Sequence, residues 1–556
     1  MEGNFIQFNR NNCRNCYKCI RACPVKSISF KDNHAEIIQQ DCIQCGACFT
    51  VCPQNAKTIR NDYDEVKKRI KEGKKVIASV APSFVANYQG ATIEGMRKAL
   101  KQLGFFDAQE TALGATVVKT EYEKILKERQ TSVLISSCCH TLNSLIEKYY
   151  PTALPYLAKV VTPMQAHCRM IKEEYPDAFT VFIGPCISKK SEIEQYPGDV
   201  DVVLTYIELS KWMREEGVVI EKEQDTEEAG KARLFPTAGG IIKTMTQEED
   251  IHYVAIDGHL NCLNALRDII DGNLKNCFVE MSFCTGSCIG GPAMEADTIQ
   301  PVRDYMAIMD YAGKNDFNVK FPQNTKKSHT YMGSGRRKPS TAEIDRIFAQ
   351  MGKTDPEKRL NCGGCGYNSC YDKAVAVWQG KAEINMCLPY LIEKSQSFSD
   401  NVIEHTPNGI IVMDEDFVIQ QINQAACDIV NMPFAKAIIG LPVDRILDTG
   451  ICEEAVESEK VIKDRVTYMS DYDKYLAQTA FYDKEYKVVT LIIRDVTDEN
   501  TAKARKAATN AKAVEITGRV IDNQMRVVQE IASLLGETVA ETQIALSKME
   551  ETLKDE

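Results

Sequence analysis

Between residues 74 and 290, short runs of apolar, β-branched residues alternate with longer stretches of mixed polarity. Such short runs, bounded by polar or turn residues, are typical of buried strands, and the longer stretches of helices. This pattern predicts an α/β domain. The strands that it predicts are residues 75–80, 132–135, 180–183, 200–205, 253–256 and 277–281.

Two other segments have different patterns. Residues 323–341 are polar, basic and rich in Gly and Pro, which predicts a linker or surface loop. From 504 to 549, small or apolar residues recur at alternating spacings of three and four, without a proline. This repeat predicts a coiled coil over 501–556, strongest from Ile521 onward. The alternative is a helix that packs back on its own domain.

Composition narrows the class of protein. A chain of 556 residues has room for about three to five domains. Its net charge of −11 argues against nucleic acid as a partner, because phosphate binding needs a basic surface. No apolar stretch is long enough to span a bilayer, and the first thirty residues lack the apolar core of a signal peptide. We therefore expect a cytoplasmic protein without membrane contact.

The chain contains 22 cysteines, and they are strongly clustered. A disulfide framework is the alternative, but such frameworks belong to small secreted domains. Metal–thiolate sites are favoured instead. Two matched runs have the spacing C-x2-C-x2-C-x3-C-P: Cys13, Cys16, Cys19 and Cys23 before Pro24, and Cys42, Cys45, Cys48 and Cys52 before Pro53.

In this spacing, three thiolates of a run and the fourth of the other run hold one [4Fe–4S] cluster. We call Cys13, Cys16, Cys19 and Cys52 the first ferredoxin set, and Cys42, Cys45, Cys48 and Cys23 the second ferredoxin set. Two zinc sites are the alternative, but zinc prefers separated pairs of ligands. The runs predict a two-cluster ferredoxin module that passes single electrons.

Three further segments each follow the carboxyl end of a predicted strand, where ligands gather in open α/β sheets. They read SSCCHTL (136–142), GPCISKKSE (184–192) and EMSFCTGSCIGGP (280–292). These segments resemble the three motifs of [FeFe]-hydrogenases. The resemblance implies an H-cluster, which is a [4Fe–4S] cluster joined to a two-iron subsite with CO, CN⁻ and a dithiolate. Its implied ligands are the catalytic set, Cys139, Cys186, Cys284 and Cys288, with Cys288 bridging to the two-iron subsite.

The same resemblance implies roles for other residues. Lys189 would donate to one cyanide, and Cys138 would exchange protons with the bridging amine. Of the usual proton path beyond that cysteine, Glu121 would be the one carboxylate left. We expect the adjacent Lys190 to be solvated and Glu192 to be structural. The residues implied to contact the two-iron subsite through backbone or side chain are Ala81, Pro82, Ser83 and Pro185.

The sequence also departs from the family pattern around the expected cluster. Gly184 and Ser282 stand where methionines are usual, and Met164 stands in place of a glutamine. His140 replaces a proline, and the positions of the usual proton path include Val118 and Ala158. Such changes leave the ligands intact but alter the residues behind them, which tune potential and proton access. They predict a catalyst of low turnover.

A third group of thiols, which we call the C-terminal set, comprises Cys362, Cys365, Cys370 and Cys387. It resembles the small four-cysteine [4Fe–4S] domain of corrinoid and Rnf-type electron-transfer subunits. A zinc knuckle is the alternative. The other cysteines, which have no partner pattern and are interpreted as core or surface residues, are Cys168, Cys262, Cys277, Cys427 and Cys452.

Residues 398–500 read as helix, strand, turn, strand, helix and, at the end, a strand running into Asp495-Val496-Thr497. This segment resembles a PAS domain, a fold that senses ligands or redox state or pairs proteins. His405 is expected to be solvated rather than a haem ligand. The predicted fold is thus multidomain α/β: a ferredoxin-like module (1–60), a two-lobed hydrogenase domain (61–322), a small helical [4Fe–4S] domain (338–395), an α+β PAS domain (398–500) and a C-terminal helix (501–556).

Three functions follow from these readings. The first is a sensory hydrogenase that oxidises H2 reversibly and heterolytically and passes electrons through [4Fe–4S] clusters to a PAS-linked output. The second is a metabolic hydrogenase that exchanges electrons with ferredoxin. The third is a non-catalytic iron–sulfur protein. The expected partners are H2, a redox partner such as ferredoxin or a signalling kinase or phosphatase, and a second copy of the chain in a homodimer.

Overall fold

The computed structural model describes residues 4–31, 34–129, 131–225, 228–295, 299–497, 521 and 523–526. The chain divides into two compact units, residues 1–383 and 384–556. Most of the predicted coiled coil lies outside the described residues. Among the residues described, none of the helices combines the length and the apolar character that crossing a membrane requires.

The two cysteine runs form one small module in the first unit. Strand β1 (Ile6–Phe8) pairs antiparallel with β4 (Lys57–Ile59), and β2 (Ile28–Lys31) pairs antiparallel with β3 (His34–Ile37). Each run continues into a short helix, α1 (Lys18–Ala22) or α2 (Ala47–Thr50). The residues before these helices, Tyr17 and Gly46, both have positive φ angles, of 56° and 75°. The internal repeat of the sequence is therefore also a repeat of backbone conformation.

The next lobe is a parallel sheet of four strands. Its order is β6 (Asp107–Glu110), β5 (Val76–Val80), β8 (Phe179–Gly184) and β9 (Val202–Thr205). Every residue of the central strand β5 is buried, because helices cover parallel sheets on both faces. The helices that belong to this lobe are α5 (Ile93–Gln102), α8 (Pro163–Glu174), α9 (Ser188–Gln195) and α10 (Tyr206–Glu216).

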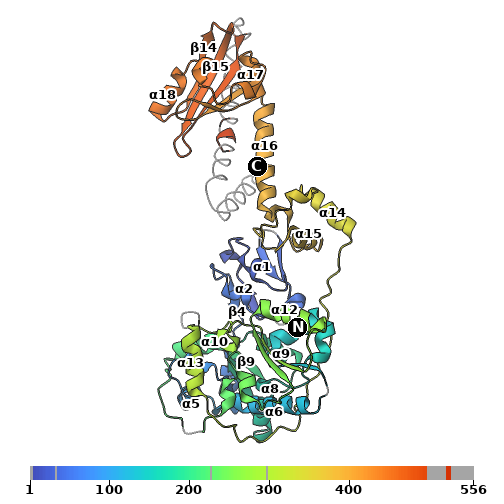
Figure 1. The fold of residues 1–556 in the computed structure, drawn as a ribbon. Coiled ribbons are helices and arrows are strands. Elements are labelled where there is room, and N and C mark those ends of the chain that lie inside the picture. The colour runs from blue at the N-terminus through green and yellow to red at the C-terminus, as the bar shows by residue number, and fades with distance from the viewer. Residues whose placement is uncertain are drawn as a thin grey trace. The chain divides into compact units, whose positions relative to one another are not determined.

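A second parallel sheet has the order β10 (His252–Asp257), β11 (Cys277–Ser282) and β7 (Val133–Ile135). Helix α6 (Ala112–Lys127) packs against α8 of the first lobe and joins the two lobes (Figure 1). Further helices of this unit are α3 (Tyr63–Lys71), α4 (Phe84–Asn87), α7 (His140–Tyr149), α11 (Gly240–Thr244), α12 (His259–Ile270), α13 (Pro301–Tyr311), α14 (Thr341–Gln350) and α15 (Cys370–Trp378).

All six predicted strands are present in these two sheets, with ends within two residues of the prediction. Strand β6 was missed, because Asp107, Gln109 and Glu110 make it read as polar. The segment 323–341 was predicted as a linker or surface loop and carries neither helix nor strand up to Ser340. Its Lys327 is nevertheless buried, so part of this segment packs into the first unit.

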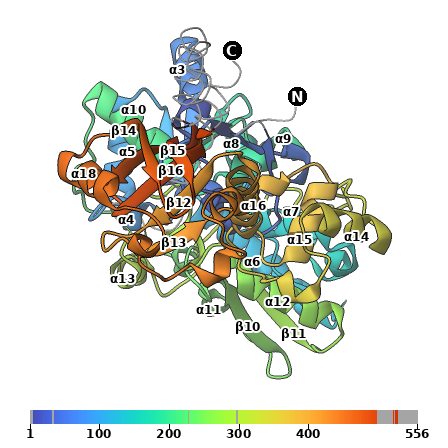
Figure 2. The ribbon, with the colours of Figure 1, turned by 90° about the horizontal axis from the view of Figure 1, so that it is seen from above.

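The second unit contains an antiparallel sheet of five strands. Their order is β13 (Ile419–Ile422), β12 (Gly409–Met413), β16 (Val488–Asp495), β15 (Lys474–Asp483) and β14 (Ile462–Met469). Helices α17 (Gln424–Ile429) and α18 (Gly450–Ser458) contribute to the apolar core on one face. Figure 2 shows the strands of this sheet and α18 from above. On the other face, Ile410, Phe481 and Ile492 pack with Ile403 and Ile521.

Helix α16 (Leu388–His405) connects the last cysteine of the C-terminal set to this sheet. Cys387 is the residue that precedes its first turn, and Ile403 near its end packs on the sheet. Helices α14 and α15 belong to the first unit, and α16 belongs to the second. His405 ends α16 and is exposed, as expected for a solvated histidine.

Candidate functional site

A cavity opens beside the carboxyl ends of β5 and β8, where the sequence placed the H-cluster. It brings together residues from all three hydrogenase-like motifs and from the segment after β5. The predicted site residues that line it are Ala81, Pro82, Ser83, Cys138, Pro185, Cys186, Lys189 and Cys288. Residues more than 200 positions apart in sequence therefore converge on one space.

The four thiols of the catalytic set lie close enough to influence one another. Cys284 interacts electrostatically with Cys186, Cys139 and Cys288, and burial raises its pKa far above the ordinary value. Burial also raises the pKa of Cys186 to about 11, while backbone N–H groups of Lys189 and Ser188 donate to its sulfur. Four crowded thiols with N–H···S bonds suit an iron–sulfur cluster, whose irons make the thiolate form stable.

Lys189 lines the cavity and forms an ion pair with Glu192. Its Nζ donates to the Cys138 backbone oxygen at 3.2 Å and to Glu192 Oε2 at 2.6 Å. Burial lowers the pKa of Lys189, but Glu192 and the nearby thiols outweigh this and raise it overall. Burial likewise raises the pKa of Glu192, but Lys189 and Lys327 hold it well below its usual range. The lysine thus stays charged, as donation to an anionic ligand requires.

The structure corrects the sequence prediction for Lys190. It was expected to be solvated, but its side chain is 0% exposed. Its Nζ donates to Asp62 at 2.6 Å, to the Val203 backbone oxygen at 2.8 Å and to Glu208 at 3.0 Å. Helix α9 is buried on two sides, so neighbouring lysines point into different polar pockets. Lys190 links the residue before helix α3 to strand β9 and helix α10 of the four-stranded lobe.

Cys138 contacts a tyrosine of helix α6. Its Sγ lies 3.3 Å from the Tyr122 hydroxyl, which also accepts the Ser137 N–H at 2.8 Å. Glu121, one residue earlier on α6, is half-buried and lies on another part of the helix surface. Burial raises the pKa of Cys138 to about 12, whereas Tyr122 and Lys189 act to lower it.

Glu280 is a second group near Cys138 that sequence reasoning missed. It is 2% exposed in strand β11, and burial raises its pKa to about 7. Its Oε2 accepts the Ile242 N–H at 3.0 Å, and the carboxyl group interacts electrostatically with Cys138. A carboxylate inside an otherwise apolar strand was the signal that could have identified it.

Ser83 is fixed at the opposite side of the cavity by Tyr206. The two hydroxyls lie 2.7 Å apart, and the Tyr206 hydroxyl also donates to the Ala81 backbone oxygen at 2.9 Å. Both side chains are fully buried. The segment 81–83 therefore presents a defined backbone and hydroxyl to the cavity.

The structure gives a physical reason for one departure from the family pattern. A side chain at Gly184 would place its Cβ 2.8 Å from the Phe182 ring and 3.2 Å from the Ala81 Cβ. Phe182 lines the cavity and fills the space that a methionine at 184 would need. Met164 lines the same cavity, as its position in the sequence predicted. His140 is buried, which lowers its pKa to about 3 and keeps it neutral.

The second ferredoxin set surrounds its own cavity. All four of its thiols line this space, together with apolar residues such as Ile6, Val25 and Ile28. Backbone N–H groups donate to the sulfurs, from Gln44 to Cys42 and from Ser27 to Cys23, both at 3.3 Å. The pairing of Cys23 with the second run agrees with the pairing expected from the sequence.

The first ferredoxin set is less enclosed. Cys19 interacts with Cys13 and Cys16, and Lys57 bonds to Cys19 and interacts electrostatically with Cys52. The Ala56 N–H donates to Cys52 Sγ at 3.4 Å. Across the described residues, no three Cys, His, Asp or Glu side chains converge as the ligands of one single metal ion do.

The residues of the C-terminal set fall on both sides of the boundary between the units in the sequence. Cys362, Cys365 and Cys370 belong to the first unit, and Cys387 belongs to the second. Cys370 begins α15, and its N–H donates to the Asn361 side chain at 2.8 Å. The other five cysteines are all buried: Cys168, Cys262, Cys277, Cys427 and Cys452.

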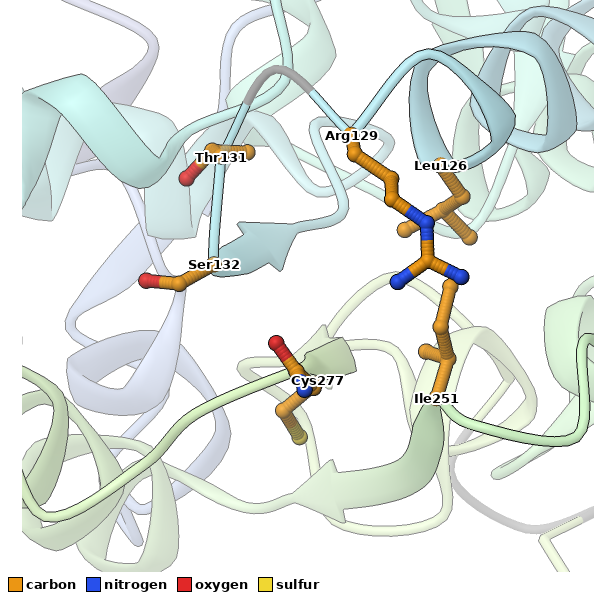
Figure 3. A pocket seen from close by; sticks show the side chains of 7 residues that line it. Leu126, Arg129, Thr131, Ser132, Ile251 and Cys277 are labelled. Atoms are coloured by element: carbon orange, nitrogen blue, oxygen red, sulfur yellow. The ribbon is translucent and has the colours of Figure 1, made fainter.

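A different cavity lies at the amino ends of β7, β10 and β11, the opposite edge of that sheet. Figure 3 shows Arg129, Thr131, Ser132, Ile251 and Cys277 around it. Arg129 forms an ion pair with Asp250. Of the candidate ligand residues, none lines this cavity, so the cavity beside β5 and β8 is the candidate active site.

Comparisons with known proteins agree with this assignment. Residues 74–292 match the family model of the iron-only hydrogenase large subunit, C-terminal domain. Residues 5–72 match a 4Fe-4S dicluster domain, and residues 359–389 match a putative Fe-S cluster family. The last match contains all four thiols of the C-terminal set.

Two curated relatives match part of this chain. Iron hydrogenase 1 of Clostridium pasteurianum is 25% identical over 300 residues, 42% of this chain and 52% of the relative. The periplasmic [Fe] hydrogenase large subunit of Nitratidesulfovibrio vulgaris is 31% identical over 278 residues, 43% of this chain and 66% of the relative. The chain thus spans about half to two thirds of each relative's length.

Among solved structures, an [FeFe]-hydrogenase of Chlamydomonas reinhardtii is 17% identical and covers 49% of this chain and 99% of its own, with a TM-score of 0.41. The two hydrogenase-related family models cover the segments that carry the ferredoxin and catalytic thiol sets. Over these segments the chain is similar to iron-only hydrogenases.

Proposed function

We propose that this chain is an H2-sensing [FeFe]-hydrogenase of low turnover, in which reversible H2 oxidation is coupled to an output by the second unit. The observation that carries the hydrogenase part is the cavity that joins Cys138 and Lys189 to the catalytic set. Neither residue is needed to hold a cubane. Both suit a site that binds an anionic group and moves protons.

The catalytic set would hold the H-cluster, which supplies the iron site for heterolytic cleavage of H2. Lys189 holds a permanent positive charge at the cavity, where it can donate to an anionic ligand. Ser83, fixed by Tyr206, supplies a hydroxyl from the other side. Cys138 is placed to exchange a proton with a group in the cavity.

From Cys138, the buried groups that follow are Tyr122 and Glu280. Tyr122 bonds to the Cys138 thiol, and Glu280 has a pKa of about 7 because it is buried. A carboxyl group with a pKa near neutrality can both take and give a proton. Proton movement in this chain therefore uses these two groups in place of the glutamates of the usual path.

The second unit is proposed to be a PAS domain. What supports this is its sheet, whose five strands have the order second, first, fifth, fourth, third by position in the chain. The sensing role is supported by α16, which runs without interruption from Cys387 to the apolar face of this sheet. A change of charge at Cys387 would act on the first turn of that helix. A signalling kinase or phosphatase, and a second copy of the chain, are the proposed partners.

Two other functions are distinguishable from this one. A metabolic hydrogenase would exchange electrons rapidly with ferredoxin, with the second unit as an accessory. A non-catalytic iron–sulfur protein would hold the cubanes without the two-iron subsite. The buried Lys189–Glu192 pair argues against the non-catalytic protein. The pair keeps a charged lysine at the cavity, and a cubane alone does not require one.

Backbone hydrogen exchange tests the sensing function. The matured protein would be compared under H2 and under argon, with turnover measured on the same sample. We expect slow turnover and an H2-dependent change of exchange in α16 and in β12 and β16, which flank the Ile403 contact. Fast ferredoxin-linked turnover with unchanged exchange in these elements would favour the metabolic hydrogenase instead.

A further inference from the structure

The loop that carries Cys362 and Cys365 is held against the ferredoxin module by two basic residues. Lys26 Nζ donates to three backbone oxygens: Ile20 at 3.0 Å, Arg21 at 3.1 Å and, across the contact, Gly366 at 3.1 Å. Arg21 donates in turn to the backbone oxygens of Gly364 at 3.4 Å and Gly363 at 3.5 Å. The cations thus bond to the backbone of both partners.

The backbones also approach each other closely at this point. Gly366 has a φ angle of +87°, and a Cβ there would lie 3.1 Å from Ile20 Cβ and 3.3 Å from the Arg21 nitrogen. A side chain would therefore separate the two loops. Lys26 interacts electrostatically with Cys23 on one side and with Cys365 on the other. Lys26 is therefore near one thiol of the second ferredoxin set and near one thiol of the C-terminal set.

A second anchor holds the far end of the same segment. Asp41 is 3% exposed, and its Oδ2 accepts Lys381 Nζ at 2.7 Å and Arg336 Nε at 2.9 Å. The Phe30 N–H, in strand β2, donates to the Lys381 backbone oxygen at 2.7 Å. Bonds on both sides of α15 fix segment 362–383 on the module.

The opposite side of the second ferredoxin set faces the catalytic set. A Cβ on Gly46 would lie 2.5 Å from Pro292 Cβ and 3.0 Å from Ile187 Cδ1, so these loops touch. Cys45 interacts electrostatically with Cys284. Lys148 reinforces the contact, since its Nζ donates to the Cys42 backbone oxygen at 2.8 Å.

We propose that the second ferredoxin set is the common neighbour of the catalytic set and the C-terminal set, and that Lys26 is the positioning residue of the second contact. In this proposal the first ferredoxin set does not connect the catalytic set to the C-terminal set. The C-terminal set is then the branch on which electrons from the active site reach the segment that leads to the second unit. This inference rests on the proposed function for the presence of clusters, but its test does not require hydrogenase activity.

The test uses the full chain with all cubanes but without the two-iron subsite, reduced with dithionite. Pulsed EPR measures the magnetic coupling of the reduced C-terminal cluster to its neighbour, with the signal assigned by its loss in Cys365→Ala. We expect the coupling to be lost in Lys26→Met, to return in Lys26→Arg and to persist in Lys68→Met, an equivalent change at an exposed lysine of α3. Lys381→Met should weaken the coupling through the other anchor.

The Cys16→Ala variant, which removes a candidate ligand of the first ferredoxin set, should leave the coupling intact. Loss of coupling in Cys16→Ala, with the signals of the second ferredoxin set and the C-terminal set still present, would overturn the proposed order. Unchanged coupling in Lys26→Met would overturn the positioning role. If the matured protein lacks CO and CN⁻ infrared bands while the coupling behaves as expected, the hydrogenase function fails and this inference stands.

Discussion

The two enclosed thiol sites of the first unit differ in what surrounds the sulfurs. The second ferredoxin set is enclosed by aliphatic side chains, and its sulfurs receive backbone N–H groups. The catalytic set opens on a cavity that also contains Cys138, Lys189 and Ser83. An apolar enclosure suits the gain and loss of an electron without a proton. Buried groups that bond and titrate are needed only where protons move as well.

The largest effect that would sharpen this contrast is expected at Cys138. The Cys138→Ala variant removes the thiol that bonds to Tyr122, and H2 oxidation should fall by about 10²–10⁴-fold, the usual contribution of a positioned acid or base. A dye-reduction assay measures the rate, and infrared bands of CO and CN⁻ should persist. Cys452→Ala, a buried cysteine of the second unit, is the control. Undiminished turnover in Cys138→Ala would refute the proton role.

The next effect concerns the buried charge behind the cavity. Glu192→Gln leaves Lys189 and Lys327 without their carboxylate, which should cost about 3–5 kcal/mol of stability at pH 7. Because the folded pKa of Glu192 is depressed, its contribution is present above the unfolded pKa of about 4.3 and is lost as pH falls through the folded pKa. The stability gap between the variant and the native chain should therefore shrink below about pH 4.

Urea unfolding of the first unit, followed at pH 7 and at pH 3.5, measures this gap. Glu194→Gln is a matched control on the same helix, because its ion pair with Arg60 is partly exposed and contributes about 1 kcal/mol or less. A gap that is constant with pH would show that Glu192 is not the group that compensates the two lysines.

A smaller effect is expected at Gly184, where Phe182 fills the space that the usual methionine would need. Gly184→Met would force a side chain against the Phe182 ring and should destabilise the chain by about 1–3 kcal/mol, the usual cost of overpacking. The double variant Gly184→Met with Phe182→Ala should recover part of this loss and return a methionine to the cavity wall. Thermal unfolding of the native chain and the two variants measures the recovery. Equal destabilisation by the single and double variants would show that Phe182 is not the obstacle.

The smallest effect is expected in the ferredoxin site. Ser27→Ala removes the hydroxyl that lies 3.4 Å from Cys23 Sγ but keeps the backbone N–H bond to the same sulfur. A net hydrogen bond of about 0.5–1.5 kcal/mol corresponds to about 20–60 mV for one electron, and its loss should lower the potential of that cluster. An EPR redox titration measures the shift, with Ser29→Ala as control. A rise in potential would contradict the account.

Much of the first unit could be predicted because its signals are local in sequence. Buried parallel strands read as apolar runs, and the thiol spacings lie within short loops, as with Cys13 to Cys23. What could not be predicted depends on contacts between distant segments. Lys190 reads like any helix lysine until Asp62 and Glu208 are seen beside it. Tyr122 meets Cys138 only because of the way α6 is turned against β7.

The surroundings of the site show the same limit. Lys327 lies in a segment that reads as a linker, yet it completes the charge pair of Glu192. Glu280 interrupts an apolar strand. This pattern indicates a buried carboxylate, but it does not identify the groups with which the carboxylate interacts. Gly184 was recognisable as a departure from the family pattern, but its reason, the ring of Phe182, is visible only in the packed structure.

Infrared spectroscopy of the matured chain under argon and then under H2 tests the central claim most directly. If the cavity of Cys138, Lys189 and the catalytic set is an H2 site, CO and CN⁻ bands should be present under argon. They should shift reversibly under H2, and Lys189→Met should move a CN⁻ band while Lys190→Met leaves it in place. Absence of these bands in protein that contains all its cubanes would contradict the account.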